Sequence, residues 1–364
     1  MSERVYNFNA GPANLPLPVL EEVQRNLLAL PGVGMSILEI SHRSSTFLGM
    51  MEEAEANLRT LLGIPEGYHV LFLPGGASLQ FAMVPLSFLP AGSSADYVVT
   101  GSWSDKAAKE ADRLAKGTAR RAWSGKAGGY VRVPAAGEVE ADPGAAYLHF
   151  TSNETIHGVC FGDARPATSV PLICDVSSDF LSRPIDVSRY AMLYAGAQKN
   201  LGPAGVTVVI LRDDLLSRIP EHLPTMLDYR VHVADKSNYN TPPVFAIYVV
   251  LLVTRWLLGE VGGLAAMLER NQEKAQLVYD AIDRSGGYYR AHAEPASRSL
   301  MNITFRLGDE EAEKRFLATA QKQGFAGLKG HRSVGGIRAS VYNAMPLDGA
   351  KALANFMDAF RSGD

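Results

Sequence analysis

The sequence predicts an α/β fold, with a large domain built on a mixed, mostly parallel sheet and a smaller α+β C-terminal domain. Short apolar runs alternate with helical stretches through most of the chain, which is typical of a parallel sheet covered by helices on both faces. From about Trp256 longer helices replace this alternation. A length of 364 residues also suits about two domains. We therefore expect a large domain at 1–255, whose first residues could pack on the small domain, and a small domain at 256–364.

The large domain is expected to begin with two helices. Pro18 to Leu30 has helical spacing, and Ser44 or Ser45 can cap a second helix. The apolar residues on the buried face of this second helix recur at intervals of three and four: Phe47, Met51, Ala54, Leu58 and Leu61.

The sheet follows as a series of apolar runs. Six strands are predicted, at Tyr68 to Leu73, Ala95 to Thr100, Ala145 to Thr151, Val170 to Asp175, Tyr190 to Gly196 and Gly205 to Leu211. Helices are expected from Leu79 to Leu89 and from Trp103 to Lys116. The Gly- and Ala-rich stretch from Gly117 to Ala146 is interpreted as irregular connection with room for a short strand. Ligands of such folds collect at the carboxyl ends of the strands.

The small domain is predicted from four features. They are a helix from Gly262 to Arg284, a strand from Met301 to Arg306, a helix from Asp309 to Gln323, and a basic, Gly-rich loop from Gly330 to Arg338 before a last strand and helix.

Composition and charge exclude several classes of protein. The formal net charge is -3, so no basic excess points to a nucleic-acid or membrane partner. Cys160 and Cys174 cannot build a disulfide framework, which favours a reducing compartment. We find no signal peptide, and the apolar run Val244 to Val253 is about half a membrane span. No metal-binding spacing occurs. We expect a cytoplasmic protein with a buried helix at this run.

The strongest chemical signal surrounds Lys199. It follows an apolar strand and lies between small residues and the turn Gly202-Pro203-Ala204-Gly205. A lone loop lysine is usually solvated, but small neighbours allow close approach of a ligand. A partly desolvated lysine has a lowered pKa and becomes a usable nucleophile.

Asp175 and a glycine turn add to this signal. Asp175 closes an apolar run, where it could simply cap a turn or could keep a pyridine nitrogen protonated next to a Schiff-base lysine. The turn Pro74-Gly75-Gly76-Ala77-Ser78 could hold a phosphate on its N–H groups, although a tight turn alone would explain its glycines. Trp103 could stack on an aromatic cofactor or lie in the core, and Thr155 could bond a ring hydroxyl or only a turn.

Two His-Arg pairs and a further arginine are candidates for binding anions. They are His42-Arg43, His331-Arg332 and Arg338. Arginine forks bind carboxylate and phosphate through two parallel hydrogen bonds. Each arginine alone is more often a solvated surface residue. Together they would suit a substrate with more than one anionic group.

The chain resembles the phosphoserine aminotransferases, class V, fold-type I pyridoxal-phosphate enzymes, almost from end to end. The resemblance rests on Tyr6 to Pro12, Ser41 to Ser44, Asn153 to Ile156, Ser182 to Gly205, Asn240 to Pro243 and Gly330 to Ser340. The runs Ala195 to Pro203 and Gly330 to Ser340 are the most specific to this family.

The resemblance implies a role for each candidate residue. Lys199 would form the Schiff base with pyridoxal 5'-phosphate and move the proton, and Asp175 would pair with the pyridinium nitrogen. Trp103 would stack on the ring and Thr155 would bond its hydroxyl.

The cofactor phosphate would rest on Ala77, Ser78 and Gln198, with Asn240 and Thr241 from the neighbouring subunit. The substrate would be bound by His42, Arg43, His331, Arg332 and Arg338. Some family members carry an arginine where this chain has Ala77, so its phosphate site relies more on N–H groups and the Ser78 hydroxyl.

The implied enzyme is a homodimer with shared active sites. It would transfer the amino group of L-glutamate to 3-phosphohydroxypyruvate, giving O-phospho-L-serine and 2-oxoglutarate in serine biosynthesis, with a further role in pyridoxine biosynthesis in some members. Three alternatives stay open: a cysteine desulfurase, an alanine–glyoxylate aminotransferase, and a non-catalytic binding protein of the same fold. Cys174 in a predicted core strand argues against the desulfurase, and retention of Lys199 and Asp175 argues against the binding protein.

Overall fold

The protein is described here by a computed structural model that covers residues 4–114 and 116–363. Its centre is a seven-stranded sheet with β10 antiparallel to both neighbours, and all other neighbouring strands run parallel. In spatial order the strands are β2 (Tyr68–Leu73), β10 (Thr207–Arg212), β9 (Met192–Gly196), β8 (Leu172–Asp175), β5 (Leu148–Thr151), β3 (Ser94–Val99) and β4 (Thr118–Ser124). The mixed, mostly parallel sheet is confirmed.

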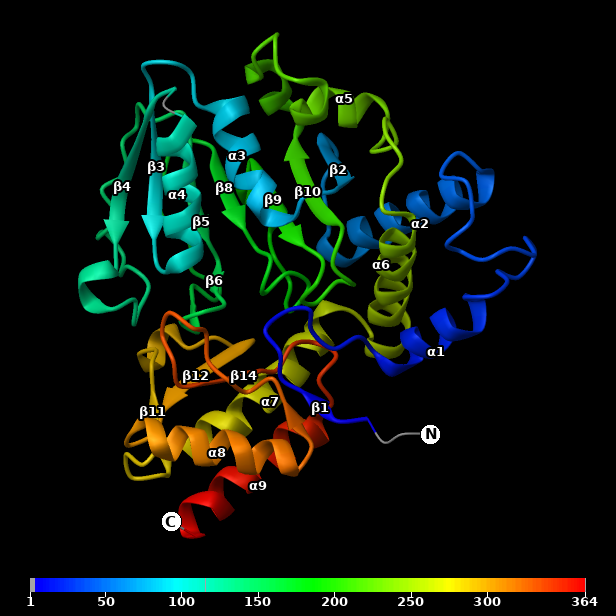
Figure 1. Cartoon of the computed structure of the whole chain (residues 1–364). Coiled ribbons are helices and arrows are strands. Elements are labelled where there is room, and N and C mark those ends of the chain that lie inside the picture. The colour runs from blue at the N-terminus through cyan, green and yellow to red at the C-terminus, as the bar shows by residue number, and fades with distance from the viewer. Residues whose placement is uncertain (1–3, 115, 364) are drawn as a thin grey trace.

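Helices cover both faces of this sheet (Figure 1). On one face lie α2 (Ser45–Leu62) and α6 (Val244–Trp256), and on the other α3 (Gly76–Phe88) and α4 (Ser102–Leu114). The sequence predicts that α4 ends at Lys116. The structure follows it to Leu114, and residue 115 lies outside the described residues. Side chains of β9 alternate between the two cores, because successive residues of a strand point to opposite faces.

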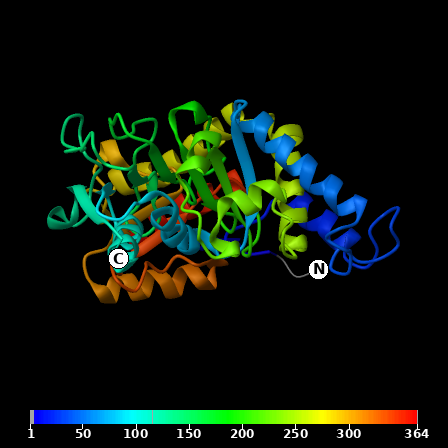
Figure 2. The same cartoon turned by 90° about the horizontal axis from the view of Figure 1, so that it is seen from above.

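The structure confirms the cap that the sequence predicts for α2. The Ser44 hydroxyl accepts a hydrogen bond from the Phe47 N–H, and the helix ends at Gly63, which has a φ of 58°. Four of the five predicted core residues are buried, but Leu62 takes the place expected for Leu61. α1 (Leu17–Asn26) is shorter than predicted. In Figures 1 and 2 the loop between α1 and α2 projects from one end of the molecule.

The apolar helix α6 is a core helix, as expected. It packs against α1 and α2, and all of its residues from Ala246 to Thr254 are buried. Together with the π-helical turn Leu257–Val261 it is long and apolar enough to cross a membrane, but 61% of this stretch is buried inside the protein. A single mostly buried helix of this kind is ordinary for a protein core.

The prediction for Gly117 to Ala146 missed the full length of one strand. β4 forms the edge of the sheet, and only Ala119 and Ala122 of its seven residues are buried. Because an edge strand with one solvated face carries polar residues such as Arg120 and Arg121, its apolar signal is weak. The remainder holds one short 3-10 helix, Lys126–Gly128, before β5.

The C-terminal part has its own core around a three-stranded sheet, β11 (Arg290–Ala291), β12 (Asn302–Arg306) and β14 (Ile337–Ser340). Its helices are α7 (Leu264–Asp283), α8 (Glu310–Lys322) and α9 (Leu347–Gly363). The chain start packs here, since β1 (Tyr6–Asn7) pairs in parallel with β13 (Phe325–Ala326) and Phe8 joins this core. The division at residue 256 stays a prediction.

The remaining short elements are α5 (Tyr229–Ala234), the hairpin β6 (Asn153–Glu154) and β7 (Val159–Cys160), and helical turns at Val187–Arg189, Asp213–Arg218, Thr225–Leu227 and Pro295–Ser297.

Candidate active site

A cavity opens where the parallel strands β5, β8 and β9 end side by side. Carboxyl ends of neighbouring parallel strands meet at the same edge of a sheet, so residues far apart in sequence come together there. The cavity is lined by Gly76, Ala77, Ser78, Trp103, Thr151, Asn153, Thr155, Asp175, Ser177, Ser178, Gln198 and Lys199. Every residue that we expected at the catalytic and cofactor site is among them, except Asn240 and Thr241, which the resemblance assigns to the neighbouring subunit.

Lys199 projects into this cavity from the turn after β9 and is 8% exposed. Its Nζ donates a hydrogen bond of 2.5 Å to Thr155 Oγ1 and lies 5.9 Å from the centre of the Trp103 ring. Burial lowers the pKa of Lys199 to about 8, although the negative charge of Asp175 opposes this shift. The amine is therefore neutral in part near physiological pH, as a nucleophile must be.

Asp175 ends β8 and is also buried. Burial raises the pKa of its carboxyl group, while hydrogen bonds from Ser177, one of them 2.9 Å long from its backbone N–H, and the charge of Lys199 act against the rise. A buried carboxylate with so few partners stabilises a positive charge placed next to it. Asp175 can therefore hold a protonated ring nitrogen of a ligand.

Glu154 fixes the position of Trp103, and the sequence interpretation missed it. This buried carboxylate accepts hydrogen bonds from the backbone N–H groups of Trp103 and Ser104, at 3.0 and 2.8 Å, and from the Ser104 hydroxyl at 2.6 Å. It thus satisfies two of the free N–H groups at the start of α4. The sequence offered one indication of this role, because Glu154 follows a strand end and immediately precedes the candidate residue Thr155.

The start of α3 provides donors for an anion. Its first residue follows Gly75, which has a φ of 93°, and no side chain from residues 4–114 or 116–363 caps the helix. The N–H groups of the first helical turn have no partner within the helix, and Gly76, Ala77 and Ser78 line the cavity. Free N–H groups and the helix dipole make such a terminus a ready phosphate site.

Unpaired buried atoms test whether a polar ligand fits the cavity. Among the described residues, Trp103 Nε1, Thr151 Oγ1 and Asn153 Oδ1 are buried without a hydrogen-bond partner. Buried polar atoms normally have partners, so these three indicate a ligand with polar groups. An amine, a carboxylate, an aromatic ring and a helix N-terminus around one space fit pyridoxal phosphate.

A group of cations lies close to the cavity. Arg338 on β14 donates from Nη1 to the Thr155 carbonyl at 3.4 Å, and its Nε is buried without a partner. Burial lowers the pKa of His331, and the charges of Arg338, Lys106 and Arg332 lower it further, so these four side chains lie near one another. Lys106 was not predicted. Its Nζ lies 4.1 Å from the centre of the Trp103 ring, one helical turn further along α4.

The other expected site residues form a second group elsewhere in the same chain. His42, Arg43, Asn240 and Thr241 do not line the Lys199 cavity. His42 and Arg43 lie close to the segment that precedes Asn240, because Asn238 Nδ2 donates to the His42 carbonyl at 3.2 Å and Arg43 Nε donates to His42 Nε2 at 3.3 Å. One chain therefore presents two separate parts of the expected site.

Comparison with known proteins decides the family. The model of the aminotransferase class-V family matches residues 5–353. The chain belongs to the class-V aminotransferases.

Within the class-V aminotransferases, this chain is similar over its whole length to proteins of one name. A phosphoserine aminotransferase of Geobacillus kaustophilus is 56% identical over 359 residues, which cover 99% of each protein. The solved phosphoserine aminotransferase of Bacillus circulans subsp. alkalophilus matches with a TM-score of 0.96 at 54% identity, covering 100% of this chain and 99% of that one. A phosphoserine aminotransferase structure concerned with radiation damage of the Schiff base has a TM-score of 0.96 at 50% identity, with 100% of both chains covered.

Proposed function

We propose that this class-V aminotransferase is a phosphoserine aminotransferase that uses pyridoxal 5'-phosphate. It transfers the amino group of L-glutamate to 3-phosphohydroxypyruvate, reversibly, giving 2-oxoglutarate and O-phospho-L-serine, a step of serine biosynthesis. The observation that carries this function is the juxtaposition of Lys199 and Asp175 in one buried cavity, with Arg338 and His331 close by. Full-length relatives at more than half identity carry the same name.

The residues of the chain divide the catalytic work. Pyridoxal phosphate, when bound, supplies the electron sink that stabilises a carbanion at the amino-acid α-carbon. Lys199 Nζ holds the cofactor and moves the α-proton, work that its lowered pKa suits. Asp175 keeps the ring nitrogen protonated. Thr155, hydrogen-bonded to Lys199, orients the amine and bonds the ring hydroxyl.

The remaining cavity residues bind and orient. Trp103, held at its backbone by Glu154, would stack on the ring of the cofactor. Ala77, Ser78 and Gln198 hold the cofactor phosphate, chiefly through the N–H groups that begin α3.

Substrate recognition rests on the cations around the cavity. His331, Arg332 and Arg338 bind the carboxylate and phosphate groups of the substrate, and His42 and Arg43 complete the set from the partner subunit. A phosphorylated keto acid carries two anionic groups and needs such a set, whereas alanine and glyoxylate carry only one carboxylate. This difference favours the phosphorylated substrate over the alanine–glyoxylate activity.

A homodimer with shared active sites explains the two separate groups of site residues. In a symmetric dimer each subunit can give the same patch to its partner, so Asn240 and Thr241 of one subunit reach the cofactor phosphate of the other. Exposed apolar side chains on α1, the following loop and the start of α2 support an interface there: Leu17, Leu27, Leu28, Met35, Leu38 and Leu48. We further propose that the protein is cytoplasmic, as expected of soluble bacterial enzymes. We also propose that it acts in pyridoxine biosynthesis in addition to serine biosynthesis.

The cysteines argue against the desulfurase alternative. Cys174 is fully buried in β8 and burial raises the pKa of its thiol. Burial also raises the pKa of Cys160, to about 12, so neither sulfur is a ready nucleophile.

The visible spectrum of the purified holoenzyme tests this function. L-Glutamate alone should shift the cofactor band to that of the aminated cofactor, and 3-phosphohydroxypyruvate should restore it. Lys199→Ala should lose this cycle. If the band responds only to another donor or acceptor, the cofactor assignment holds and the substrate assignment fails. If no cofactor band appears after pyridoxal phosphate is added, the proposed function is wrong. A band that goes through the full cycle excludes the non-catalytic binding protein.

A further inference from the structure

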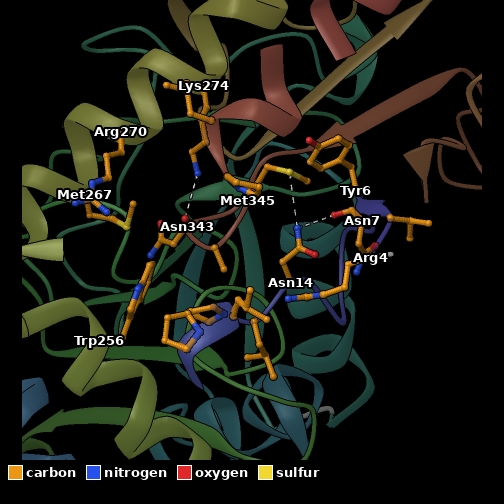
Figure 3. Close-up of a pocket in the computed structure, with 18 of the residues that line it drawn as sticks. Arg4, Tyr6, Asn7, Asn14, Trp256, Met267, Arg270, Lys274, Asn343 and Met345 are labelled. Atoms are coloured by element: carbon orange, nitrogen blue, oxygen red, sulfur yellow. Dashed lines mark hydrogen bonds between the residues drawn. The ribbon is translucent and has the colours of Figure 1, made fainter. Parts of the chain in front are cut away.

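A second, larger cavity of about 590 Å³ shares no residue with the active site. Figure 3 shows it between the N-terminal segment, the helix α7 and the connection that leads into α9. A volume of this size lies within the range of small-molecule sites, about 300–1,000 Å³. The proposed aminotransferase reaction gives this cavity no role.

Most of its wall is apolar. Trp256 lies on one side, and Met267 and Met345 point toward the same space (Figure 3). The N-terminal segment adds the run from Leu15 to Pro18. Such a surface favours a ligand with an apolar body, because burial of apolar area drives binding.

The polar part of the wall is dominated by cations. Lys274 on α7 is 2% exposed, and its Nζ donates to the carbonyl oxygens of Tyr342 and Asn343, at 2.6 and 3.3 Å. Arg270, one turn earlier, donates to the Glu260 carbonyl at 3.4 Å, its only hydrogen bond among the described residues. Arg4 also lines the cavity, and Glu273 is the only acidic residue among the lining residues.

None of these three cations is within 4.0 Å of a carboxylate in the part of the chain that the structure describes. A buried charge is normally paired with an opposite charge, so an anion bound here would give the Lys274 ammonium the partner that it lacks. We propose that this cavity binds a small organic carboxylate with an apolar body. The anionic end lies toward Lys274 and Arg270, and the apolar body lies against Trp256, Met267 and Met345.

The electrostatics of Lys274 agree with this geometry. Burial lowers its pKa to about 7, and the positive charge of Arg270 adds to the shift. The other titratable groups that line the cavity are Arg4, Tyr6 and Glu273. A bound carboxylate favours the charged ammonium and raises its pKa, so binding takes up a proton above pH 7. The affinity therefore falls as the pH rises above about 7.

Titration of the holoenzyme with 3-phenylpropionate, followed by tryptophan fluorescence, tests this site. We expect a saturable change that Trp256→Phe abolishes and that saturating L-glutamate leaves unaltered. The uncharged analogue 3-phenylpropanamide should bind about tenfold more weakly, since it lacks the charge-assisted hydrogen bonds. Absence of any saturable change, or equal affinities of acid and amide, overturns the proposal.

Two variants locate the anion. Arg270→Ala should weaken binding of the acid about tenfold while leaving the amide unaffected, because the truncation removes only a cation. Lys322→Ala, which removes an exposed cation from α8 outside this cavity, is the matched control and should change neither affinity. An Arg270→Ala enzyme that binds the acid as the unaltered enzyme does overturns the site. These binding readouts do not depend on transamination, so the proposed function can fail without this site failing.

Discussion

At the scale of single residues, the chemistry depends on two charges that folding removes from water. Lys199 and Asp175 are both buried, and burial shifts the pKa of each toward its neutral form. Their mutual attraction opposes both shifts. A ligand that binds between them can therefore change the protonation of both groups, whereas a solvated lysine and aspartate would stay charged.

The pH dependence of cofactor uptake should report the pKa of Lys199. An amine with a lowered pKa is mainly neutral, and thus nucleophilic, above about pH 8 and not only above its ordinary value of 10.5. We expect the rate at which the apoenzyme takes up pyridoxal phosphate to rise with pH and to level off just above 8. Absorbance kinetics on the apoenzyme measure this rate. A rise that continues to pH 10 contradicts the burial of this amine.

Removal of the charge of Asp175 should be far more damaging than removal of a neighbouring buried charge. Asp175→Asn leaves the ring nitrogen without its anion, so we expect transamination to fall about 100-fold or more and the cofactor band to move. Asp179→Asn is the matched control, because Asp179 is equally buried but bonds Ser152 and does not line the cavity. Steady-state rates and visible spectra of both variants decide the point. Similar losses of rate and the same spectral change in both would refute a specific role for Asp175.

At the scale of elements, the site depends on how strand ends and helix starts meet. The ends of β5, β8 and β9 supply Thr151, Asp175 and the turn to Lys199, while α3 and α4 begin at the same edge. Glu154 connects two of these elements by bonding the start of α4. Trp103, which we propose to stack on the cofactor, is thereby positioned by a carboxylate from another segment.

A single methyl group at Gly101 should disturb this connection. A Cβ at Gly101 would lie 2.4 Å from Glu154 Cδ, so Gly101→Ala forces the carboxylate away from α4. Overpacking of this kind costs about 1–3 kcal/mol, and we expect weaker binding of pyridoxal phosphate as well. Denaturant unfolding and cofactor titration provide the two measurements.

Gly49→Ala on α2 is the matched control. Outside its chain neighbours and the backbone of its own helix, no heavy atom of the described residues lies within 4 Å of the added Cβ. Alanine also favours the helix, so this variant should be stabilised by up to about 1 kcal/mol with unaltered cofactor binding. Equal effects of the two substitutions would contradict the steric argument.

At the scale of the whole molecule, the residues that we propose for one site do not all line one cavity of the chain. The cavity at Lys199 lacks His42, Arg43, Asn240 and Thr241. The same chain exposes Leu28 and Leu38, which are 87% and 63% exposed, in the loop that projects from one end. Both features are accounted for by the proposed dimer.

An aspartate in this loop should separate the proposed subunits. Leu28→Asp places a charge in an apolar interface, so we expect sedimentation to shift from twice the chain mass of 39.3 kDa toward the monomer. Cofactor affinity should fall with it, because Asn240 and Thr241 would be lost from the site. Lys322→Asp puts the same residue on an exposed part of α8 and should stay dimeric. A Leu28→Asp protein that remains a dimer with full cofactor affinity places the interface elsewhere.

Several parts of the fold and site were predictable because local residues determine them. The strand Tyr68 to Leu73, the Ser44 cap and the core helix α6 follow from apolar runs and capping chemistry, and the structure confirms all three. β4 was underestimated because a solvated edge strand carries few apolar residues. Glu154 and Lys106 were missed because their roles depend on contacts with Trp103, not on a motif of their own.

The sequence by itself determined the chemistry: a lysine after one apolar strand, an acid at the end of another, a glycine turn and paired cations, in an order that resembles one family. These features are local, so residue type and spacing suffice to find them. Only the tertiary structure decided which of them share a cavity and which lie apart. It alone revealed the carboxylate behind Trp103 and the cation-lined cavity at Lys274, because burial and pairing of charges depend on segments that meet only when the chain has folded.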